Sequence, residues 1–324
     1  MALPFTLHTK LSISTTSVRL FYVPIISPRA SHKPFEVNAS TLRLRGLSLS
    51  LVSDKRLSHC GSISSSTTRV SMATKGEVKK EVFESAEDLA VSLAKYTAQL
   101  SDKFCKERGA FSVVLSGGSL INSLRKLVEP PYIDSIEWSK WHIFWADERV
   151  VPKDHEDSNY KLAYDGFLSK VPILPGNVYA INDALSAEGA AEDYETCLRH
   201  LVKSNVVDIS AASGFPKFDL QLLGMGPDGH VASLFPGHPL LKENEKWVTY
   251  IKDSPKPPPE RITFTFPVIN SSAYIALVVN GANKAGAVQN ALGNSQNSEK
   301  LPVAMVSPEG ELAWFLDTAA ASKL

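Results

Sequence analysis

Residues 111–119 read FSVVLSGGS, a short apolar run typical of a buried strand followed at once by a glycine-rich turn. Residues 120–128 then predict a helix. The same order, an apolar run of strand length and then a polar loop, recurs at residues 141–145, 218–223 and 273–279. Short apolar runs that alternate with longer amphipathic stretches are typical of an α/β domain. We therefore predict one domain in which helices flank a mainly parallel β-sheet.

Helix and loop signals around these strands fit the same architecture. Ser85 and Asp88 have the spacing of a capping box, and apolar residues follow at helical intervals as far as Gly109. Residues 252–260 (KDSPKPPPE) predict a stiff surface connector, because proline interrupts both helices and central strands. This connector precedes an expected strand at residues 261–266, RITFTF.

The first 72 residues differ in composition from the rest of the chain. The chain has 34 Lys and Arg and 34 Asp and Glu, but nine of the former and two of the latter lie in residues 1–72, with 15 Ser and 7 Thr. A segment rich in Ser and poor in acids is typical of an organellar transit peptide. We predict a disordered transit peptide at residues 1–72 and a folded domain at residues 73–324; a plain disordered tail is the alternative.

Residues 73–324 carry a formal charge of minus seven, since most of the acids lie there. Nucleic acids and anionic membranes attract proteins with a basic field, so this composition argues against both as partners. No stretch reaches the roughly 18 to 20 apolar residues that a transmembrane helix needs.

The chain ends in Ser322, Lys323 and Leu324, the tripeptide that the peroxisomal import receptor reads at a free carboxyl end. We therefore expect an organellar import machinery as one partner and the peroxisomal receptor as another. The N-terminal transit peptide and the C-terminal tripeptide can both act as targeting signals if folding, partner binding or translation from Met72 decides which one is exposed.

Glycines and charged side chains follow the predicted strands, where ligands collect in open α/β sheets. Gly117 and Gly118 allow backbone N–H groups to converge on an anion, and the helix that follows Ser119 adds a favourable dipole, so phosphate is the expected ligand. Arg149, in the run ADER at residues 146–149, can hold a phosphate through two hydrogen bonds while an adjacent carboxylate orients it. An ordinary turn and a surface salt bridge are the alternatives.

Residues 222–238, LLGMGPDGHVASLFPGH, place Asp228 two positions before His230 on a glycine-rich loop. Histidine titrates near neutral pH and can take a proton from water, and a carboxylate beside it favours the charged form. The pair therefore predicts general-base chemistry, with a structural loop histidine as the alternative. Arg261 and Lys284 can face the same cleft, although each could also be an ordinary surface charge.

Several other chemistries lack their sequence signals. The glycines of residues 224–229 match a dinucleotide-binding pattern, but Pro227 and Asp228 stand where a pyrophosphate needs N–H donors, and position 249 is Thr instead of an acid. The sequence has no G-x-S-x-G elbow and no P-loop. His230 and His238 lack the spacing of metal ligands, so we expect neither a metal nor a cofactor.

The three cysteines also give no sign of a metal site. Cys60, Cys105 and Cys197 form no CxxC pair, and Cys60 lies in the expected transit peptide. We therefore predict neither a zinc site nor a disulfide framework. Redox regulation through Cys105 or Cys197 remains open.

Five segments, in this order and at these separations, resemble the 6-phosphogluconolactonase family: SGGS (116–119), ADER (146–149), DSNY (157–160), the run at 222–238 and RITFT (261–265). The resemblance extends over about residues 77–319, and its most specific piece is GPDGH followed by ASLFPG. It implies a Rossmann-like fold similar to that of glucosamine-6-phosphate deaminases and ribose-5-phosphate isomerase. It also implies a plant plastid (chloroplast stroma) enzyme that hydrolyses a sugar-phosphate lactone without a metal or cofactor.

The resemblance further implies roles for individual residues. His230 would be the general base that activates water, with Asp228 beside it, and the phosphate would be bound by Gly117, Gly118, Ser119, Arg149, Arg261 and Lys284. Two departures are visible: Leu120-Ile121 replaces a common Thr-Pro, and Val231 replaces a common Thr. The first removes a hydroxyl donor near the phosphate turn.

Two rival functions remain at this stage. A sugar-phosphate isomerase or deaminase of the same fold is one, although these deaminases typically have an Asn-Glu-Pro region where this chain has residues 233–236 (SLFP). An inactive relative that acts as an interaction or redox-sensing protein is the other. The presence of Asp228, His230 and Arg149 argues against it.

Overall fold

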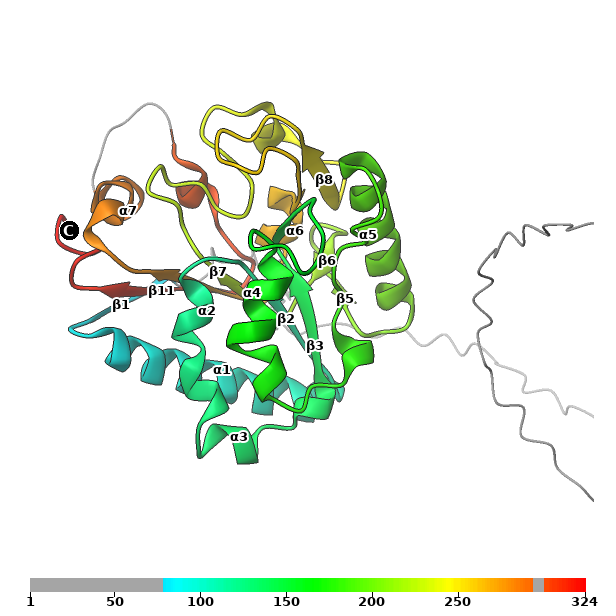
Figure 1. Cartoon of the computed structure of the whole chain (residues 1–324). Helices are drawn as coiled ribbons and strands as arrows, with labels where there is room; N and C mark the ends of the chain where they lie inside the picture. The colour runs from blue at the N-terminus through cyan, green and yellow to red at the C-terminus, as the bar shows by residue number, and fades with distance from the viewer. Residues whose placement is uncertain (1–77, 294–299) are drawn as a thin grey trace, which may run out of the picture. The chain divides into compact units, whose positions relative to one another are not determined.

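Six parallel strands form the main sheet of the protein in a computed structural model, which describes residues 78–293 and 300–324 (Figure 1). All described residues belong to one compact unit. The strand order is β1-β11-β10-β7-β2-β3, and every neighbouring pair is parallel. These strands are β1 (Val78–Phe83), β2 (Phe111–Leu115), β3 (Trp141–Trp145), β7 (Leu220–Leu223), β10 (Tyr274–Val279) and β11 (Glu311–Asp317).

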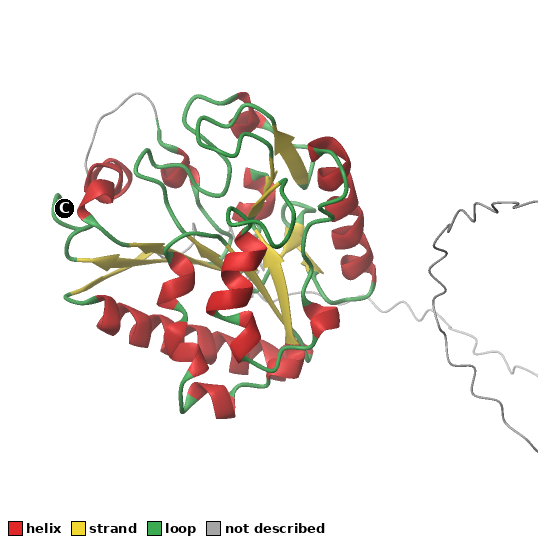
Figure 2. Cartoon of the chain, in the orientation of Figure 1, coloured by secondary structure: helices red, strands yellow, loops and turns green. Residues whose placement is uncertain are grey.

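Helices cover both faces of this sheet, so the predicted α/β class is confirmed (Figure 2). One hydrophobic core joins α1, α2 and α4 to one face, and a second joins α5, α6 and α7 to the other. Side chains alternate between the two cores along a strand: Val113 and Leu115 enter the first, and Val114 the second. The helices are α1 (Ala86–Arg108), α2 (Leu120–Ser123), α3 (Tyr132–Ser135), α4 (Asn159–Gly166), α5 (Ala187–Lys203), α6 (Phe266–Asn270) and α7 (Ala285–Leu292).

Two small antiparallel sheets accompany the main one. The larger has the order β4-β9-β8, built from β4 (Asp147–Arg149), β8 (Val248–Ile251) and β9 (Arg261–Phe264), and the smaller pairs β5 (Asp208–Ile209) with β6 (Pro216–Lys217). The strand expected at 261–266 is shorter than predicted, because Phe266 already begins α6 and Pro267 occupies its first turn. The strand expected at 218–223 likewise begins only at Leu220.

The helical stretch expected at residues 120–128 is present, but it is not one continuous α-helix. Only α2, Leu120–Ser123, is α-helical, and Arg125–Val128 continue as a 3₁₀ helix. The stretch ends at Val128 because Glu129 precedes Pro130, and the residue before a proline disfavours helical backbone. The first helix, in contrast, is confirmed: Ser85 accepts a hydrogen bond from the backbone N–H of Asp88, and Gly109 ends the helix at a φ of 76°.

The sheet order creates a cleft between β2 and β7. From β2 the chain runs outward to β3, whereas from β7 it moves the opposite way to β10 and β11, so the loops after β2 and β7 diverge at this point. Such a topological switch is where open α/β sheets bind ligands. At the opposite end, Asp219 fixes the junction by accepting hydrogen bonds from the Ser112 N–H (2.8 Å) and from Arg108 (2.7 Å).

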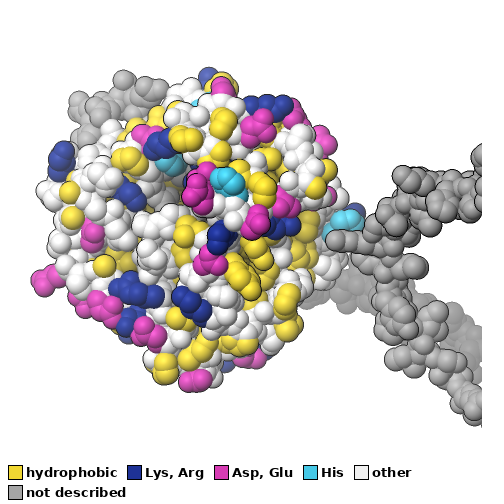
Figure 3. Space-filling model, viewed as in Figure 1, with side chains coloured by type: hydrophobic (Ala, Val, Ile, Leu, Met, Phe, Trp, Pro, Cys, Tyr) yellow, Lys and Arg dark blue, Asp and Glu magenta, His cyan; other side chains and the backbone are white. Residues whose placement is uncertain are grey.

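Some sequence predictions fall outside the described residues, namely the transit peptide and Cys60. Within the described ranges, no helix combines the length and the apolar character needed to cross a membrane. The face seen in Figure 3 carries interspersed basic and acidic side chains and no extended basic patch. Cys105 is buried and Cys197 half-buried, and both are free thiols.

Candidate active site

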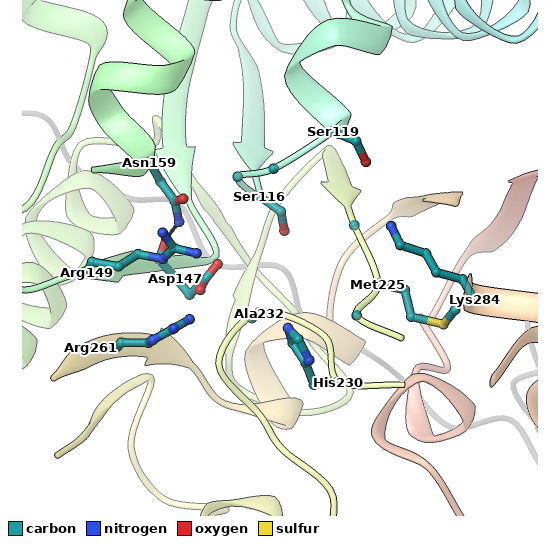
Figure 4. Close-up of a pocket in the computed structure, with 14 residues that line it drawn as sticks. Ser116, Ser119, Asp147, Arg149, Asn159, Met225, His230, Ala232, Arg261 and Lys284 are labelled. Atoms are coloured by element: carbon teal, nitrogen blue, oxygen red, sulfur yellow. Dashed lines mark hydrogen bonds between the residues drawn. The ribbon is translucent and has the colours of Figure 1, made fainter. Parts of the chain in front are cut away.

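The cleft at the carboxyl ends of the strands collects nearly all of the predicted site residues (Figure 4). Seven of the eight line it, and the eighth, Asp228, contacts His230 from behind. Figure 4 shows the residue 116–119 turn on one side of the cleft and His230 opposite, with Arg149 and Arg261 at one end and Lys284 at the other. The full lining is Ser116, Gly117, Gly118, Ser119, Asp147, Arg149, Asn159, Gly224, Met225, Gly226, His230, Ala232, Arg261 and Lys284.

The turn after β2 presents free backbone donors to this cleft. Among the described residues, the N–H groups of Gly117, Gly118 and Ser119 have no hydrogen-bond partner. Gly118 has a φ of 71°, which favours glycine. A Cβ on Gly117 would lie 1.9 Å from Oδ1 of Asn159, so any larger residue there would displace the Asn159 side chain. The turn therefore suits an anion through its N–H groups, and the short α2 adds little of the dipole that the sequence predicted.

Arg149 and Arg261 lie side by side across the antiparallel pair β4–β9. Neither guanidinium pairs with a carboxylate in the described part of the chain, and Nε of Arg149 is buried without a partner. Burial, and then the neighbouring charge of Arg149, lower the pKa of Arg261. Two adjacent, partly desolvated guanidinium groups without an acidic partner are a strong site for a dianion.

The expectation that an adjacent carboxylate orients Arg149 is wrong. Nη1 of Arg149 donates to the main-chain carbonyl of Asp157 (2.8 Å), whereas Glu148 turns away and accepts hydrogen bonds from the backbone N–H groups of Arg149, Asn159 and Tyr160. Burial raises the pKa of Glu148 to about 7 in spite of these bonds. Glu148 therefore anchors the start of α4, which explains why the ADER and DSNY segments occur together.

Lys284 approaches the cleft from the opposite end, after β10 (Figure 4). It ends the 3₁₀ helix Ala282–Lys284, which Asp317 holds in place by accepting a hydrogen bond from the Gly281 N–H (2.9 Å). Burial lowers the pKa of Lys284, although Asp317 acts in the opposite direction. An ammonium group that has already lost part of its hydration pays little further desolvation free energy when it binds an anion.

His230 and Asp228 form a short pair, with 2.6 Å between Nδ1 and Oδ1. A carboxylate can only accept a hydrogen bond, so Nδ1 is the protonated nitrogen and Nε2 keeps its lone pair. Nε2 has no partner among the described residues, and the ring lines the cleft. Burial lowers the pKa of His230 below 6.5, and Lys256 adds to this, while Asp228 acts in the opposite direction. His230 is therefore a neutral base at physiological pH.

The Asp228 carboxylate stays ionised beside the ring. Burial raises its pKa, but the hydrogen bonds from His230 and Lys256 outweigh burial, and the net pKa is lowered. Lys256 Nζ lies 3.1 Å from Oδ1 of Asp228 and 3.3 Å from Nδ1 of His230. A histidine held by an ionised carboxylate has a fixed tautomer and ring orientation.

Gly226 makes room for this pair, and this gives a first prediction. A Cβ at position 226 would lie 2.1 Å from the His230 ring and 2.6 Å from Oδ1 of Asp228. Because both contacts are ends of side chains, Gly226→Ala should displace the base without unfolding the protein. We expect turnover to fall about tenfold, as misplaced catalytic groups do. Gly286→Ala, where a Cβ meets nothing within 4 Å, is the matched control. Equal turnover of both variants in a steady-state assay would contradict this account.

Sequence reasoning missed several residues of the site. Lys256 belongs to the proline-rich connector and carries no motif, so only the fold brings it to Asp228. Asp147 is buried and accepts a hydrogen bond from Oγ of Ser233 (2.8 Å), and Asn159 donates to the Asp147 carbonyl (2.9 Å). Asp147 lies in the ADER segment and Asn159 in the DSNY segment. The family resemblance of these two segments was the one sequence signal that could have identified them as site residues.

Comparison with known proteins now decides the family. Residues 84–314 match the family described as glucosamine-6-phosphate isomerases/6-phosphogluconolactonase. The chain belongs to this family. A member from Arabidopsis thaliana named "6-phosphogluconolactonase 3, chloroplastic" is 67% identical over 261 residues, which cover 81% of this chain and 79% of that protein. A member from Oryza sativa subsp. japonica named "Probable 6-phosphogluconolactonase 4, chloroplastic" is 74% identical over 245 residues, with 75% and 76% covered.

Solved structures of family members have the same fold. A crystal structure of 6-phosphogluconolactonase from Thermotoga maritima has a TM-score of 0.62 and 29% identity, and covers 74% of this chain and 100% of its own. A monomeric glucosamine-6-phosphate deaminase has a TM-score of 0.60 at 22% identity, covering 76% and 100%. The fold predicted from the resemblance is thereby confirmed, and the protein named as a deaminase has this fold as well.

Proposed function

We infer that this protein is a 6-phosphogluconolactonase, which hydrolyses 6-phospho-D-glucono-1,5-lactone to 6-phospho-D-gluconate in the oxidative pentose phosphate pathway. The observation that carries this assignment is a neutral, oriented base, His230, in the same cleft as free N–H groups and guanidinium groups that form no ion pair with a carboxylate among the described residues. A lactone phosphate requires that combination: a base for water and a separate anchor for the dianion. The relatives at 67% and 74% identity bear names of this activity.

The proposed reaction is a hydrolysis of the ring ester. Water attacks the lactone carbonyl while Nε2 of His230 takes its proton, and the carbonyl oxygen gains negative charge. The bond from the carbonyl carbon to the ring oxygen then breaks, and the imidazolium returns the proton to that oxygen, which becomes a hydroxyl group. The product is an open-chain acid. Donors around the cleft stabilise the developing charge.

The phosphate anchor is proposed from charge and burial. Gly117, Gly118 and Ser119 offer N–H groups, and Arg149 and Arg261 offer cations that form no ion pair with an acid among the described residues; the resemblance adds Lys284, which enters from the opposite end of the cleft. Binding at this remote group positions the carbonyl against water and His230, so that binding energy contributes to turnover. For Lys284 the phosphate-binding role rests on the resemblance alone, because Arg149 and Arg261 lie at the other end of the cleft.

The substrate test compares two sugar phosphates. Purified full-length protein should hydrolyse the phosphorylated lactone above its spontaneous rate, measured by coupling the product to its dehydrogenase. It should not release ammonia from glucosamine 6-phosphate. The reverse result would favour the deaminase activity of the family. Lack of both activities would favour an inactive interaction protein. Redox sensing has little chemical support, because burial raises the pKa of both Cys105 and Cys197 and lowers their thiolate fraction.

A pH profile gives a second prediction. The base must be neutral, and burial together with Lys256 holds the pKa of His230 below 6.5. The acid limb of kcat/KM should therefore lie below pH 6.5, and activity should fall only as pH drops through that limb. The measurement is kcat/KM between pH 5 and 8, corrected at each pH for spontaneous opening of the lactone. An acid limb above pH 6.5 would contradict a desolvated base.

Targeting is proposed from both ends of the chain. The acid-poor composition of residues 1–72 and the chloroplastic names of the relatives support import into the plastid by its import machinery. Ser322, Lys323 and Leu324 support a second address read by the peroxisomal receptor, and Leu324 is exposed. Fluorescent protein fused to either end in turn tests this. A peroxisomal signal is expected only when the Leu324 carboxyl end is free, and plastid signal only when the N-terminus is free.

A further inference from the structure

Lys256 lies behind the catalytic base and has no counterpart among the predicted site residues. Its ammonium group is 3.1 Å from Oδ1 of Asp228 and 3.3 Å from Nδ1 of His230. It does not line the cleft, so it faces the side of the imidazole that is turned away from substrate. Nδ1 already donates its proton to Asp228, and an ammonium group has no acceptor, so the Lys256–His230 contact is electrostatic.

The position of Lys256 is imposed by its loop. The guanidinium of Arg261 donates to three consecutive main-chain carbonyls, those of Lys256 (2.8 Å), Pro257 (3.0 Å) and Pro258 (3.0 Å). Ser254 closes the other side, since its Oγ donates to the Lys256 carbonyl (2.8 Å) and accepts from the Lys256 N–H (3.2 Å). A rigid, proline-rich connector clamped in this way delivers one ammonium group to a fixed place.

We propose that Lys256 is a positioning residue for the hydrolysis: it fixes the Asp228 carboxylate and keeps the His230 imidazole neutral in the resting enzyme. The ammonium group shares the carboxylate charge that would otherwise favour imidazolium, and it repels a second positive charge on the ring. A protonated His230 cannot accept the proton of water. Lys256 therefore acts through Asp228 and His230, and it does not contact the substrate.

Arg261 connects the loop that carries Lys256 to the proposed phosphate-binding residues. The same side chain lines the cleft and holds the connector backbone, and only 3% of Arg261 is exposed. The connector therefore joins the two halves of the site, the anchor and the base, through one buried guanidinium. The sequence does not indicate this link, because Arg261 comes from a strand, Lys256 from a loop, and the Asp228–His230 pair from the turn after β7.

The test measures the protonation of His230 directly in full-length protein. The NMR signal of the His230 ring, assigned by its loss in His230→Ala, is titrated in wild type, Lys256→Met and Lys256→Arg. We expect the pKa of His230 to rise by about one unit in Lys256→Met, and the acid limb of kcat/KM to move up by the same amount while KM changes little. Lys256→Arg keeps the charge and should stay near wild type. All of these Lys256 variants keep the other charged groups around His230, so a difference in its pKa is due to position 256. These groups are Asp228, Asp147, Arg261 and Lys284.

Lys252→Met is the matched control, because this lysine of the same connector pairs with Glu188 on α5. It should leave the titration unchanged. An unchanged pKa and acid limb in Lys256→Met would overturn the proposal, as would an equal shift in Lys252→Met. Lys256→Gln serves if the Met variant does not fold. The inference rests on the proposed function for the role of His230, but the two can fail separately. Absence of lactonase activity in wild type refutes the function, whereas the ring titration tests Lys256 without substrate.

Discussion

His230→Ala should lower kcat for the phosphorylated lactone by about 100-fold or more, which is the usual loss when a general base is removed. The ring combines a free lone pair on Nε2 with a fixed orientation, since Asp228 holds Nδ1 at 2.6 Å. KM should change little, because the phosphate anchor is built from other residues. The measurement is steady-state kinetics with the spontaneous rate subtracted.

A second histidine of the same loop provides the control. His238 caps the 3₁₀ helix Pro239–Lys242 and faces Asp253, and it does not line the cleft. His238→Ala should keep wild-type turnover, and free imidazole added to His230→Ala should restore part of it above the background with imidazole alone. Near-normal turnover of His230→Ala would remove this residue from the mechanism.

Arg149→Met should raise KM for the phosphorylated lactone about 100-fold, because hydrogen bonds to a charged group contribute about 1.5–3 kcal/mol each. Met keeps the apolar stem but removes the guanidinium. Glucono-1,5-lactone, which has no phosphate, should be hydrolysed equally by variant and wild type. This contrast separates loss of the anchor from general damage to the cleft.

Arg199→Met is the matched control for this variant. Arg199 pairs with Glu195 on α5 and is not part of the cleft lining. Its replacement should leave both substrates unaffected. If Arg149→Met raises KM equally for the phosphorylated and the unphosphorylated lactone, Arg149 does not bind the phosphate. If KM changes for neither lactone, the phosphate is bound by the residue 116–119 turn, Arg261 and Lys284 without Arg149.

Local sequence signals predicted the parts of the fold that depend on neighbouring residues. The capping pair Ser85 and Asp88, Gly109 and the buried strand of residues 111–115 all appear as expected. Helix ends and buried strands are determined by interactions within a few residues, and these leave a pattern in the sequence. The stretch after Ser119 is helical as predicted, but it divides into a short α-helix and a 3₁₀ helix, a division that no local signal in the sequence indicated.

Motifs identified the chemical groups of the site but not how they work together. The sequence alone predicted a base at His230 and cations at Arg149, Arg261 and Lys284, since these residues lie in loops or at the ends of predicted strands. It placed Asp228 beside the histidine because two positions on a tight loop leave little choice. These are statements about residue type and local spacing, and they needed no knowledge of the fold.

The tertiary structure decided everything that depends on strand pairing. The pairing of β4 with β9 places two guanidinium groups together, the topological switch between β2 and β7 places the residue 116–119 turn opposite His230, and the clamped connector brings Lys256 to Asp228. These contacts join residues far apart in the chain. Periodicity and motifs report on one element at a time, whereas which elements meet depends on the burial of the whole core, and that is settled only when the sheet assembles.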